Sequence, residues 1–309
     1  MKIDVKRLRR DFGRIEAVKD ISFSFETGQI FGFIGPNGSG KTTTLRILAT
    51  LDLPTSGDAF IDDSSITLYP EKNRHHIGFV PDSLPLHRDI SVHEYVDFFA
   101  RAYGLRGRER TRSVAHIEDF TGLSHLRERM INKLSKGMKQ RVSLARALVH
   151  NPSVLLMDEP ASGLDPRARI ELRELLKILC EQKKAVLISS HILTELTEIC
   201  NGVVIIETGS IVDTGMIEDI TRKSRQHITL LIRTLTDQET LVRDCLEMPG
   251  VMDIRKSHKR IAVDFKGDDA GCSEFLKLLI EKGHRIAEFS HEQDSLEDLF
   301  MRMTKGDVQ

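Results

Sequence analysis

The chain has 309 residues, of which 40% are hydrophobic and 29% charged, a composition typical of a globular protein with room for one large domain and a smaller one. Its 45 Lys and Arg nearly balance its 46 Asp and Glu, so no overall basic field favours binding to nucleic acid or to a membrane surface. No apolar run reaches the roughly 18–20 residues that a membrane-spanning helix needs, and MKIDVKRLRR lacks the apolar core of a signal peptide. We therefore expect a cytosolic protein.

The cysteines occur singly, without a C-x-x-C pair. This spacing favours reduced thiols that fill the core over a metal site or a disulfide framework. They are Cys180, Cys200, Cys245 and Cys272.

Up to about residue 218, short β-rich runs alternate with helical patterns, which predicts an α/β domain with a largely parallel sheet. In chain order the runs are IDVKRL, QIFGFIG, HIGFV, SVLLMDE, AVLISS and GVVIIETG. SVLLMDE and AVLISS are almost continuously apolar, as expected of strands that are covered on both faces. The mostly helical stretch from about residue 92 to 150 is expected to form a subdomain of its own.

The pattern changes after residue 219. HITLLIRTL is followed by the helical ETLVRDCLEM, two short β-rich runs, the helical SEFLKLLIEKG and a last run, RIAEFS. The order β-α-β-β-α-β predicts a ferredoxin-like module. We therefore expect a first domain over residues 1–218 and a small α+β accessory domain over residues 219–309, in which no residue pattern indicates catalysis.

A phosphate-binding motif follows the run QIFGFIG. GPNGSGKT matches G-x-x-x-x-G-K-[ST], with a strand before it and a helical pattern after it, the context that the motif requires. The glycines let backbone N–H groups turn towards phosphate oxygens at the positive end of the helix. Lys41 is expected to neutralise the β- and γ-phosphates, and the Thr42 hydroxyl to ligate Mg²⁺. The expected phosphate contacts are Gly35, Pro36, Asn37, Gly38, Ser39, Gly40, Lys41, Thr42 and Thr43.

Two adjacent carboxylates end the apolar run SVLLMDE. Asp158 is expected to hold Mg²⁺ through water, because this ion keeps much of its hydration shell. Glu159 is then free to orient or deprotonate the attacking water. The run INKLS, residues 131–135, has serine where a guanine-reading N-K-x-D motif has aspartate, so a GTPase is disfavoured.

With these motifs in place, LSKGMKQR at residues 134–141 resembles the signature sequence of ABC ATPases. The phosphate loop, the signature, the DEP strand end, ASGLD and SSH follow in the family's order, from about Met1 to Gly215. The chain is similar to the ATP-binding subunit of an ABC transporter, and the segment SLEDLFMRMT is similar to the type-2 exporter branch. The resemblance implies a P-loop NTPase fold with a parallel-sheet core, an antiparallel β subdomain and a helical subdomain.

The resemblance also implies roles for single residues. Phe12 falls where an aromatic ring stacks on adenine, with Val18 as a second apolar contact; the alternative for Phe12 is a core-filling ring. His191 matches the switch histidine that contacts the γ-phosphate and helps to fix the attacking water. Residues 162–165 match the loop that touches the partner subunit, although the same residues could also cap a helix before Pro166.

The signature residues Ser135, Gly137 and Met138 would face the ATP of a second subunit, because the family places two subunits head to tail. The resemblance therefore implies a homodimer, or a heterodimer with a similar ABC subunit. This dimer would sit on a separate integral-membrane permease, which would hold the chain peripherally on the inner face of the cell membrane. Nucleic acid is not an expected partner.

Two positions depart from the family pattern. Asp82 replaces the glutamine that usually reaches Mg²⁺ and senses the membrane subunit; it is a candidate outer metal contact or a plain surface aspartate. Lys136 replaces the first signature glycine. It could add a cation beside the nucleotide or point to solvent.

The resulting hypothesis is an ATPase, with ATP and Mg²⁺ as cofactors, that powers an ABC transporter of the export type. The main alternative is an ABC ATPase acting on nucleic acid or ribosomes, but such chains usually carry two cassettes or a long coiled-coil insertion, and neither is present. A regulatory subunit that is silent because of Asp82 and Lys136 is a third possibility. The residues indicate neither the cargo nor, beyond the resemblance, the direction of transport.

Overall fold

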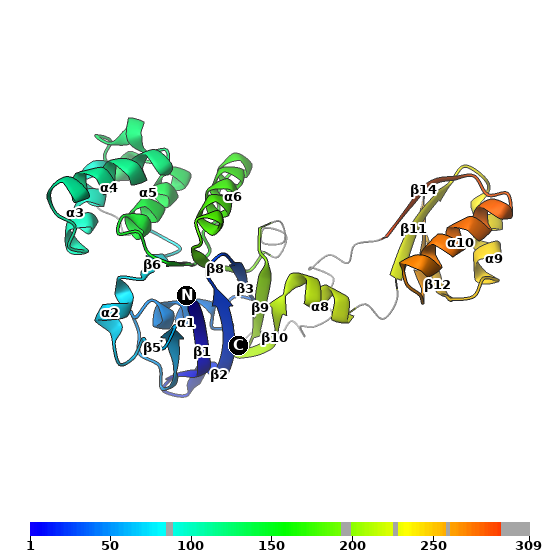
Figure 1. Cartoon of the computed structure of the whole chain (residues 1–309), viewed down its shortest axis with the longest axis horizontal. Helices are drawn as coiled ribbons and strands as arrows, with labels where there is room; N and C mark the ends of the chain where they lie inside the picture. The colour runs from blue at the N-terminus through cyan, green and yellow to red at the C-terminus, as the bar shows by residue number, and fades with distance from the viewer. Residues whose placement is uncertain (85–88, 193–198, 225–227, 258–259, 292–309) are drawn as a thin grey trace. The chain divides into compact units, whose positions relative to one another are not determined.

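The structure is a computed structural model that describes residues 1–309 except 85–88, 193–198, 225–227, 258–259 and 292–309 (Figure 1). The described residues fall into two compact units, residues 1–217 and the part from residue 218 onward. Within these residues, no helix is both long and apolar enough to cross a membrane.

The first unit is built around a six-stranded sheet with the order β10-β9-β3-β8-β7-β6. All neighbours from β9 to β6 run parallel, and only β10 is antiparallel. This confirms the predicted α/β fold. The strands are β3 (Ile30–Ile34), β6 (Ile77–Val80), β7 (Val154–Met157), β8 (Ala185–Ser190), β9 (Gly202–Glu207) and β10 (Ser210–Met216).

A second sheet of the same unit is antiparallel, with the order β2-β1-β4-β5. Its buried side chains share one hydrophobic core with the central sheet, and Phe23 of β2 lies 5.6 Å from Phe33 of β3, measured between ring centroids. Helix α1 (Lys41–Leu48) contributes Leu45, Ile47 and Leu48 to this core. The phosphate loop is therefore anchored in the core through β3 before it and α1 after it. The strands are β1 (Lys2–Phe12), β2 (Ile15–Glu26), β4 (Ser56–Ile61) and β5 (Ser64–Ser65).

Helices gather on the other side of the first unit (Figure 1). Ser91 and Glu94 form a reciprocal capping box at the start of α3, which fixes where this helix begins. The carboxylate of Glu118 is buried, lies 2.7 Å from His93 Nδ1 and forms an ion pair with Arg127, whose Nε is 2.8 Å away, so it ties three segments together. The elements are α2 (Pro70–Arg74), α3 (Val92–Ala102), α4 (Gly107–Phe120), η1 (Ser124–Leu126), η2 (Ile131–Lys133) and α5 (Lys136–Leu148).

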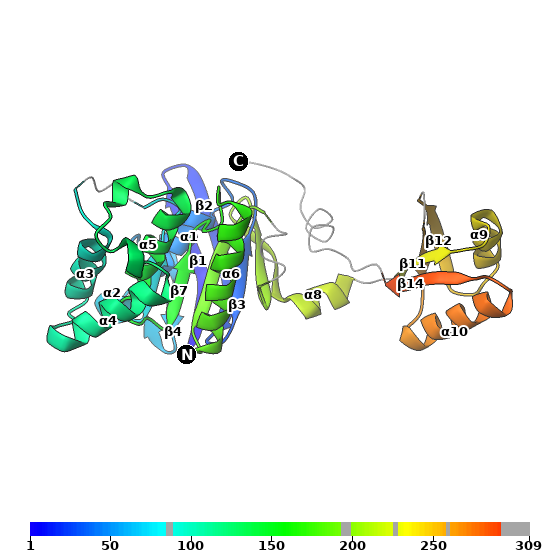
Figure 2. The same ribbon diagram turned by 90° about the horizontal axis from the view of Figure 1, so that it is seen from above.

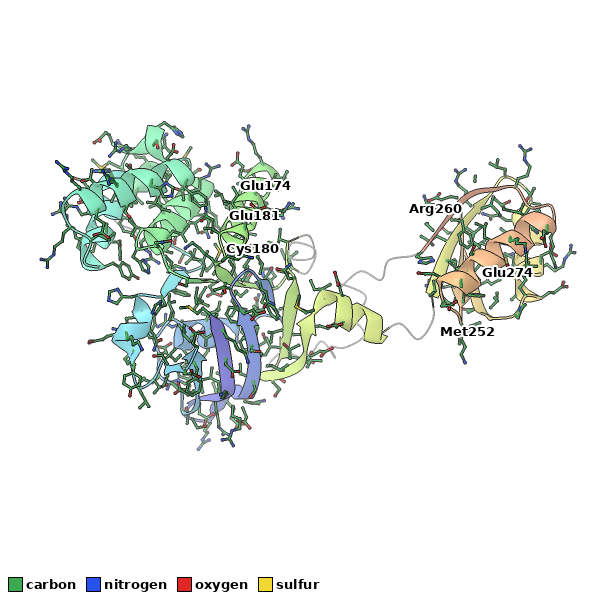
Figure 3. All side chains as sticks on the ribbon, in the orientation of Figure 1. Glu174, Cys180, Glu181, Met252, Arg260 and Glu274 are labelled. Atoms are coloured by element: carbon green, nitrogen blue, oxygen red, sulfur yellow. The ribbon has the colours of Figure 1, made fainter. Side chains whose placement is uncertain are left out.

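Helix α6 (Pro166–Glu181) begins at Asp165, whose carboxylate accepts a bond from the Ala168 N–H. It lies over the central sheet (Figure 2) and carries Glu174 and Cys180 (Figure 3). The Cys180 thiol donates to the Gly28 carbonyl at 3.0 Å. Among the described residues all four cysteines are free, and Cys245 and Cys272 are buried.

The second unit has the element order β-α-β-β-α-β after helix α8 (Ile217–Ser224), with the antiparallel sheet order β12-β13-β11-β14. It has a hydrophobic core of its own, formed by alternate strand residues such as Leu230 and Val263 together with Phe275 and Leu279. Figure 3 marks Met252 on β12 and Glu274 on the exposed side of α10. The elements are β11 (Ile228–Thr234), α9 (Gln238–Leu246), β12 (Val251–Lys256), β13 (Ile261–Phe265), α10 (Asp269–Glu281) and β14 (Ile286–His291).

His150, just after α5, makes the folding of the first unit sensitive to acid. Its ring stacks on Tyr103 at 3.6 Å, and its Nε2 donates to the Ile77 carbonyl at 3.1 Å. Burial lowers the pKa of His150 to about 4, against a partly opposing effect of that hydrogen bond. Between pH 6.5 and about 4 the unfolded chain therefore binds a proton at this residue that the folded chain does not.

We expect the folded state to lose stability as the pH falls through this window. His150→Gln should lose less between pH 7 and pH 5, because its amide can still donate to Ile77 and does not titrate. Urea denaturation of both chains at the two pH values measures the difference. Equal losses in the two chains would contradict the assignment to His150.

Candidate functional site

The phosphate loop connects β3 to α1 and has a backbone that only glycine permits at key positions. Gly38 and Gly40 have φ angles of 82° and 101°, in the left-handed region. A β-carbon at Gly35 would overlap the Ile206 carbonyl oxygen, and one at Gly40 would overlap the Ala17 carbonyl oxygen. Close packing of the loop on its neighbours thus explains the glycines that the sequence motif displays.

Lys41, the first residue of α1, is almost fully buried. Its Nζ donates to the carbonyl oxygens of Gly35 at 2.7 Å and Pro36 at 3.0 Å, and lies 3.6 Å from Glu159 Oε1. Burial lowers the pKa of Lys41, while the neighbouring carboxylates act in the opposite direction. A buried ammonium above a glycine-rich loop is suited to meet a polyanion.

The buried carboxylate of Asp158, which follows β7, joins the loop to the neighbouring strands. Its Oδ1 accepts bonds from the Thr42 hydroxyl at 3.2 Å and from the Ser189 hydroxyl at 2.7 Å. Its N–H donates to the Val80 carbonyl at 2.8 Å, which continues the pairing of β7 with β6. Asp158 is only 4% exposed, so these bonds hold it in one position.

Glu159 stands beside Asp158 in an unusual backbone conformation. Its φ angle is 47°, a left-handed value that costs a residue with a side chain of the order of 1–3 kcal/mol. Its N–H donates to the Ser189 hydroxyl at 2.9 Å, and its Oε2 lies 2.8 Å from His191 Nδ1. The structure therefore brings Glu159 and His191 together, at the edge of the loop that holds Lys41.

Ser189 was missed by the sequence analysis. Its hydroxyl donates to the Asp158 carboxylate and accepts from the backbone N–H of Glu159, so one buried side chain holds the first carboxylate and the backbone of the second residue. The only signal for it in the sequence is a polar residue at the end of the apolar run AVLISS.

The oxygens of Thr42 and Asp158 fit a magnesium ion. Mg²⁺ prefers oxygen ligands and usually takes one or two carboxylates, with substrate phosphates and water filling the other positions. Among the described residues, no group of three or more His, Cys, Asp and Glu could hold a metal. An ion at this point would thus need phosphate oxygens and water to complete its shell.

Three other residues that the sequence predicted to contact adenine or the metal are Phe12, Val18 and Asp82. Phe12, at the end of β1, is 48% exposed, and the Arg10 guanidinium lies 4.5 Å from its ring centroid. This exposure leaves the ring available for stacking. Val18 is fully buried and packs beneath the loop at Gly40, so it supports the loop from below. Asp82 is exposed after β6 and makes no hydrogen bond or ion pair with the described residues.

The signature segment forms a second group. Ser135 caps α5, and its hydroxyl accepts a bond from the Met138 N–H at 3.3 Å, which confirms the predicted helix start. Gly137 packs against Leu164 and Ala168 at the start of α6. Within the described chain, no hydrogen bond or ion pair connects Ser135 to the phosphate loop. The predicted site residues thus form two separate groups on one subunit.

Comparison with known proteins agrees with this arrangement. A family model described as "ABC transporter" matches residues 18–162. The uncharacterized ABC transporter ATP-binding protein YxlF of Bacillus subtilis is 32% identical, over 97% of this chain and 99% of that protein. The linearmycin resistance ATP-binding protein LnrL of the same organism is 33% identical, over 98% of both chains.

Solved structures give the same result. One titled "Structure of ATP binding subunit of ABC transporter" superposes with a TM-score of 0.66 at 29% identity, over 72% of this chain and 93% of that chain. The chain therefore belongs to the ATP-binding subunits of ABC transporters.

Proposed function

We propose that the chain hydrolyses ATP at the site around Lys41, Asp158 and Glu159, and that this reaction drives an export-type permease. The observation that carries the proposal is the connected set of bonds that joins the phosphate loop to Asp158, Glu159 and His191. ATP hydrolysis is the reaction of the family, and this geometry supports the proposed roles of these residues.

The loop and α1 would bind the triphosphate. Backbone N–H groups of residues 37–42 would face phosphate oxygens, and Lys41 would exchange its bonds to the carbonyls of Gly35 and Pro36 for bonds to the β- and γ-phosphates. The exposed ring of Phe12 would stack on adenine. A Mg²⁺ held by Thr42 and, through water, Asp158 would neutralise charge on the phosphates.

Glu159 would act on the attacking water. The water oxygen forms a bond to the γ-phosphorus while the bond from this phosphorus to the β–γ bridging oxygen breaks, leaving ADP and inorganic phosphate. Glu159 takes up the proton of the water, and His191, 2.8 Å from Glu159, orients this carboxylate and the γ-phosphate. Ser189 is a positioning residue because it bonds the Asp158 carboxylate and the backbone N–H of Glu159 and is itself buried.

A single subunit carries only half of what charge stabilisation requires. Ser135 at the start of α5 and the loop of residues 161–165 form a group that, among the described residues, makes no hydrogen bond or ion pair with the subunit's own phosphate loop. We propose that they face the ATP of a second subunit, in a homodimer or a heterodimer with a similar chain. ATP would thus hold two subunits together, and hydrolysis would release them.

A hollow of about 360 Å³ in the first unit is our candidate contact for the permease. Its walls combine three arginines with apolar side chains, which suits an apolar segment that carries acidic groups. Leu51, at its rim, is 53% exposed, and Pro81 immediately precedes Asp82, the position that the family uses to sense the membrane subunit. The lining residues are Arg46, Ala49, Leu51, Arg74, Ile77, Phe79, Pro81, Phe99, Tyr103, Arg146 and Ala147.

The export direction is supported by a relative that aligns over nearly its full length and is named for linearmycin resistance. Attachment to a permease would hold the chain on the cytoplasmic face of the membrane. None of the relatives described above is named for a role with nucleic acid or ribosomes, so the non-transport alternative gains no support.

Glu159→Gln should bind ATP but turn it over at least about 100-fold more slowly, since the amide cannot accept the proton from water. It should accumulate as an ATP-dependent dimer, which light scattering after size exclusion would detect. Lys41→Ala is the matched control: it should lose ATP binding and therefore the dimer. Normal hydrolysis by Lys41→Ala would disprove the assignment of the phosphate loop.

Ser189→Ala should lower the turnover number by roughly tenfold while the dissociation constant of ATP changes little, because the loop remains while the Asp158 carboxylate and the Glu159 backbone lose their common anchor. Ser143→Ala, at an equally buried serine on α5, controls for the loss of a buried hydroxyl. Steady-state ATPase assays and nucleotide binding measure both quantities. Equal turnover in the two variants would remove Ser189 from the mechanism.

Leu51→Asp should weaken permease binding without changing ATP binding, because it places a charge at the rim of the proposed docking hollow. Affinity purification of the chain from detergent-solubilised native membranes, followed by mass spectrometry, would show the loss. Leu68→Asp, which is 72% exposed outside this hollow, is the control. If Leu51→Asp retained as much integral-membrane protein as Leu68→Asp, the docking surface would lie elsewhere.

A further inference from the structure

The starts of α5 and α6 lie side by side. A β-carbon at Gly137 would lie 3.5 Å from the Ala168 β-carbon and 3.9 Å from Leu164 Cδ2. One turn further along, Arg141 of α5 forms an ion pair with Glu171 of α6. The two helix starts therefore form one rigid surface, which carries Ser135 and the loop of residues 161–165.

Lys136, the first residue of α5, crosses this surface and ends above Gly163. A β-carbon at Gly163 would lie 2.5 Å from Lys136 Nζ and 3.4 Å from each of its Cδ and Cε atoms. Gly163 has a φ angle of 65° and is exposed. The missing side chain at Gly163 thus provides the space in which the ammonium group of Lys136 lies.

This ammonium group has no counter-charge on the described part of the chain. Nearby cations do have one, since Arg141 and Arg167 both pair with Glu171. At the starts of these helices, the Asp165 carboxylate accepts the Ala168 N–H of α6 and the Ser135 hydroxyl accepts the Met138 N–H of α5. The exposed Lys136 ammonium itself makes no ion pair or hydrogen bond with the described residues, so it is available to an external anion.

We infer that Lys136 supplies an additional cation to the triphosphate bound by the partner subunit. The inference rests on the proposed head-to-tail dimer, in which Ser135 and the loop of residues 161–165 face that triphosphate. A lysine ammonium binds phosphate as a point charge and needs no fixed geometry. The flexible Lys136 side chain that lies over Gly163 can therefore bring its charge to a phosphate. Lys136, which replaces the first signature glycine, would thus add a positive charge beside the γ-phosphate of the partner's ATP.

The test uses the dimer that Glu159→Gln should form with ATP. In this background, Lys136→Met keeps most of the length of the side chain but removes the charge, and Lys136→Arg keeps the charge. We expect Lys136→Met to raise the dissociation constant of the ATP-dependent dimer about 10- to 100-fold, as for the loss of one or two charge-assisted hydrogen bonds. Lys136→Arg should retain most of the affinity, and the affinity of the monomer for ATP should not change.

Lys177→Met is the matched control, because Lys177 lies on α6 and pairs with the exposed Glu174 marked in Figure 3. It should leave the dimer unchanged. Sedimentation equilibrium at several salt concentrations gives the constants, and high salt should reduce the effect of Lys136→Met because a charge is involved.

Gly163→Ala tests the placement of the ammonium group. The added methyl should displace Lys136 and weaken the dimer, but should add little in a chain that already carries Lys136→Met. Gly104→Ala has the same left-handed backbone strain with no atom within 4 Å, and therefore controls for strain alone.

The outcomes separate the two proposals. If Glu159→Gln dimerises with ATP and Lys136→Met does not weaken the dimer, or weakens it no more than Lys177→Met, only the inference on Lys136 falls. Additive effects of Gly163→Ala and Lys136→Met would also overturn it. If Glu159→Gln binds ATP and remains a monomer, the proposed dimer fails and the role of Lys136 fails with it.

Discussion

The candidate site depends on the burial of one carboxylate, that of Asp158. Burying a charged carboxylate is unfavourable unless hydrogen bonds replace its contacts with water. Here Thr42 and Ser189 supply those bonds. Thr42 follows β3 and Ser189 lies in β8, and the sheet has the order β3-β8-β7 at this point. Because β3, β8 and β7 are parallel neighbours, their carboxyl ends meet at one edge of the sheet. The sheet topology is therefore what brings three distant parts of the sequence to one carboxylate.

The same carboxylate sets the position of the catalytic group next to it. With Asp158 held inward, Glu159 can point towards Lys41 and His191 only through a sharp change of backbone direction, seen in its φ angle of 47°. The Ser189 hydroxyl accepts the N–H that this turn leaves free, which offsets part of the strain. A strained residue that is fixed by its surroundings is common where a side chain must be aimed at a substrate. The geometry of Glu159 is thus a consequence of how Asp158 is buried.

The sequence predicts the parts of this site that are encoded locally. The phosphate loop, the two carboxylates at a strand end and the Ser135 cap are each defined by residues within about eight positions of one another, and the structure has the strand, the loop and the helix where they were expected. Ser189 could not be recognised in this way, because its role depends on the pairing of β7 with β8 and of β8 with β3. The full burial of Val18 was likewise hidden, since the antiparallel sheet covers it. The contact between Lys136 and Gly163 joins segments that only helix packing brings together.

The division of the site into two groups has a physical basis in the phosphate loop. The buried ammonium of Lys41 is bonded by the carbonyls of Gly35 and Pro36 and paired with Glu159, all from its own subunit. A triphosphate must replace those bonds, so the gain in free energy from Lys41 is reduced by what it gives up. Ser135 and Lys136 are exposed and make no bond to the loop within the described residues, so on binding phosphate they would give up contacts with water instead. A second subunit would therefore bring donors and charge to the γ-phosphate without breaking any of the bonds that hold Lys41 in the first subunit. This favours a dimer whose stability depends on ATP.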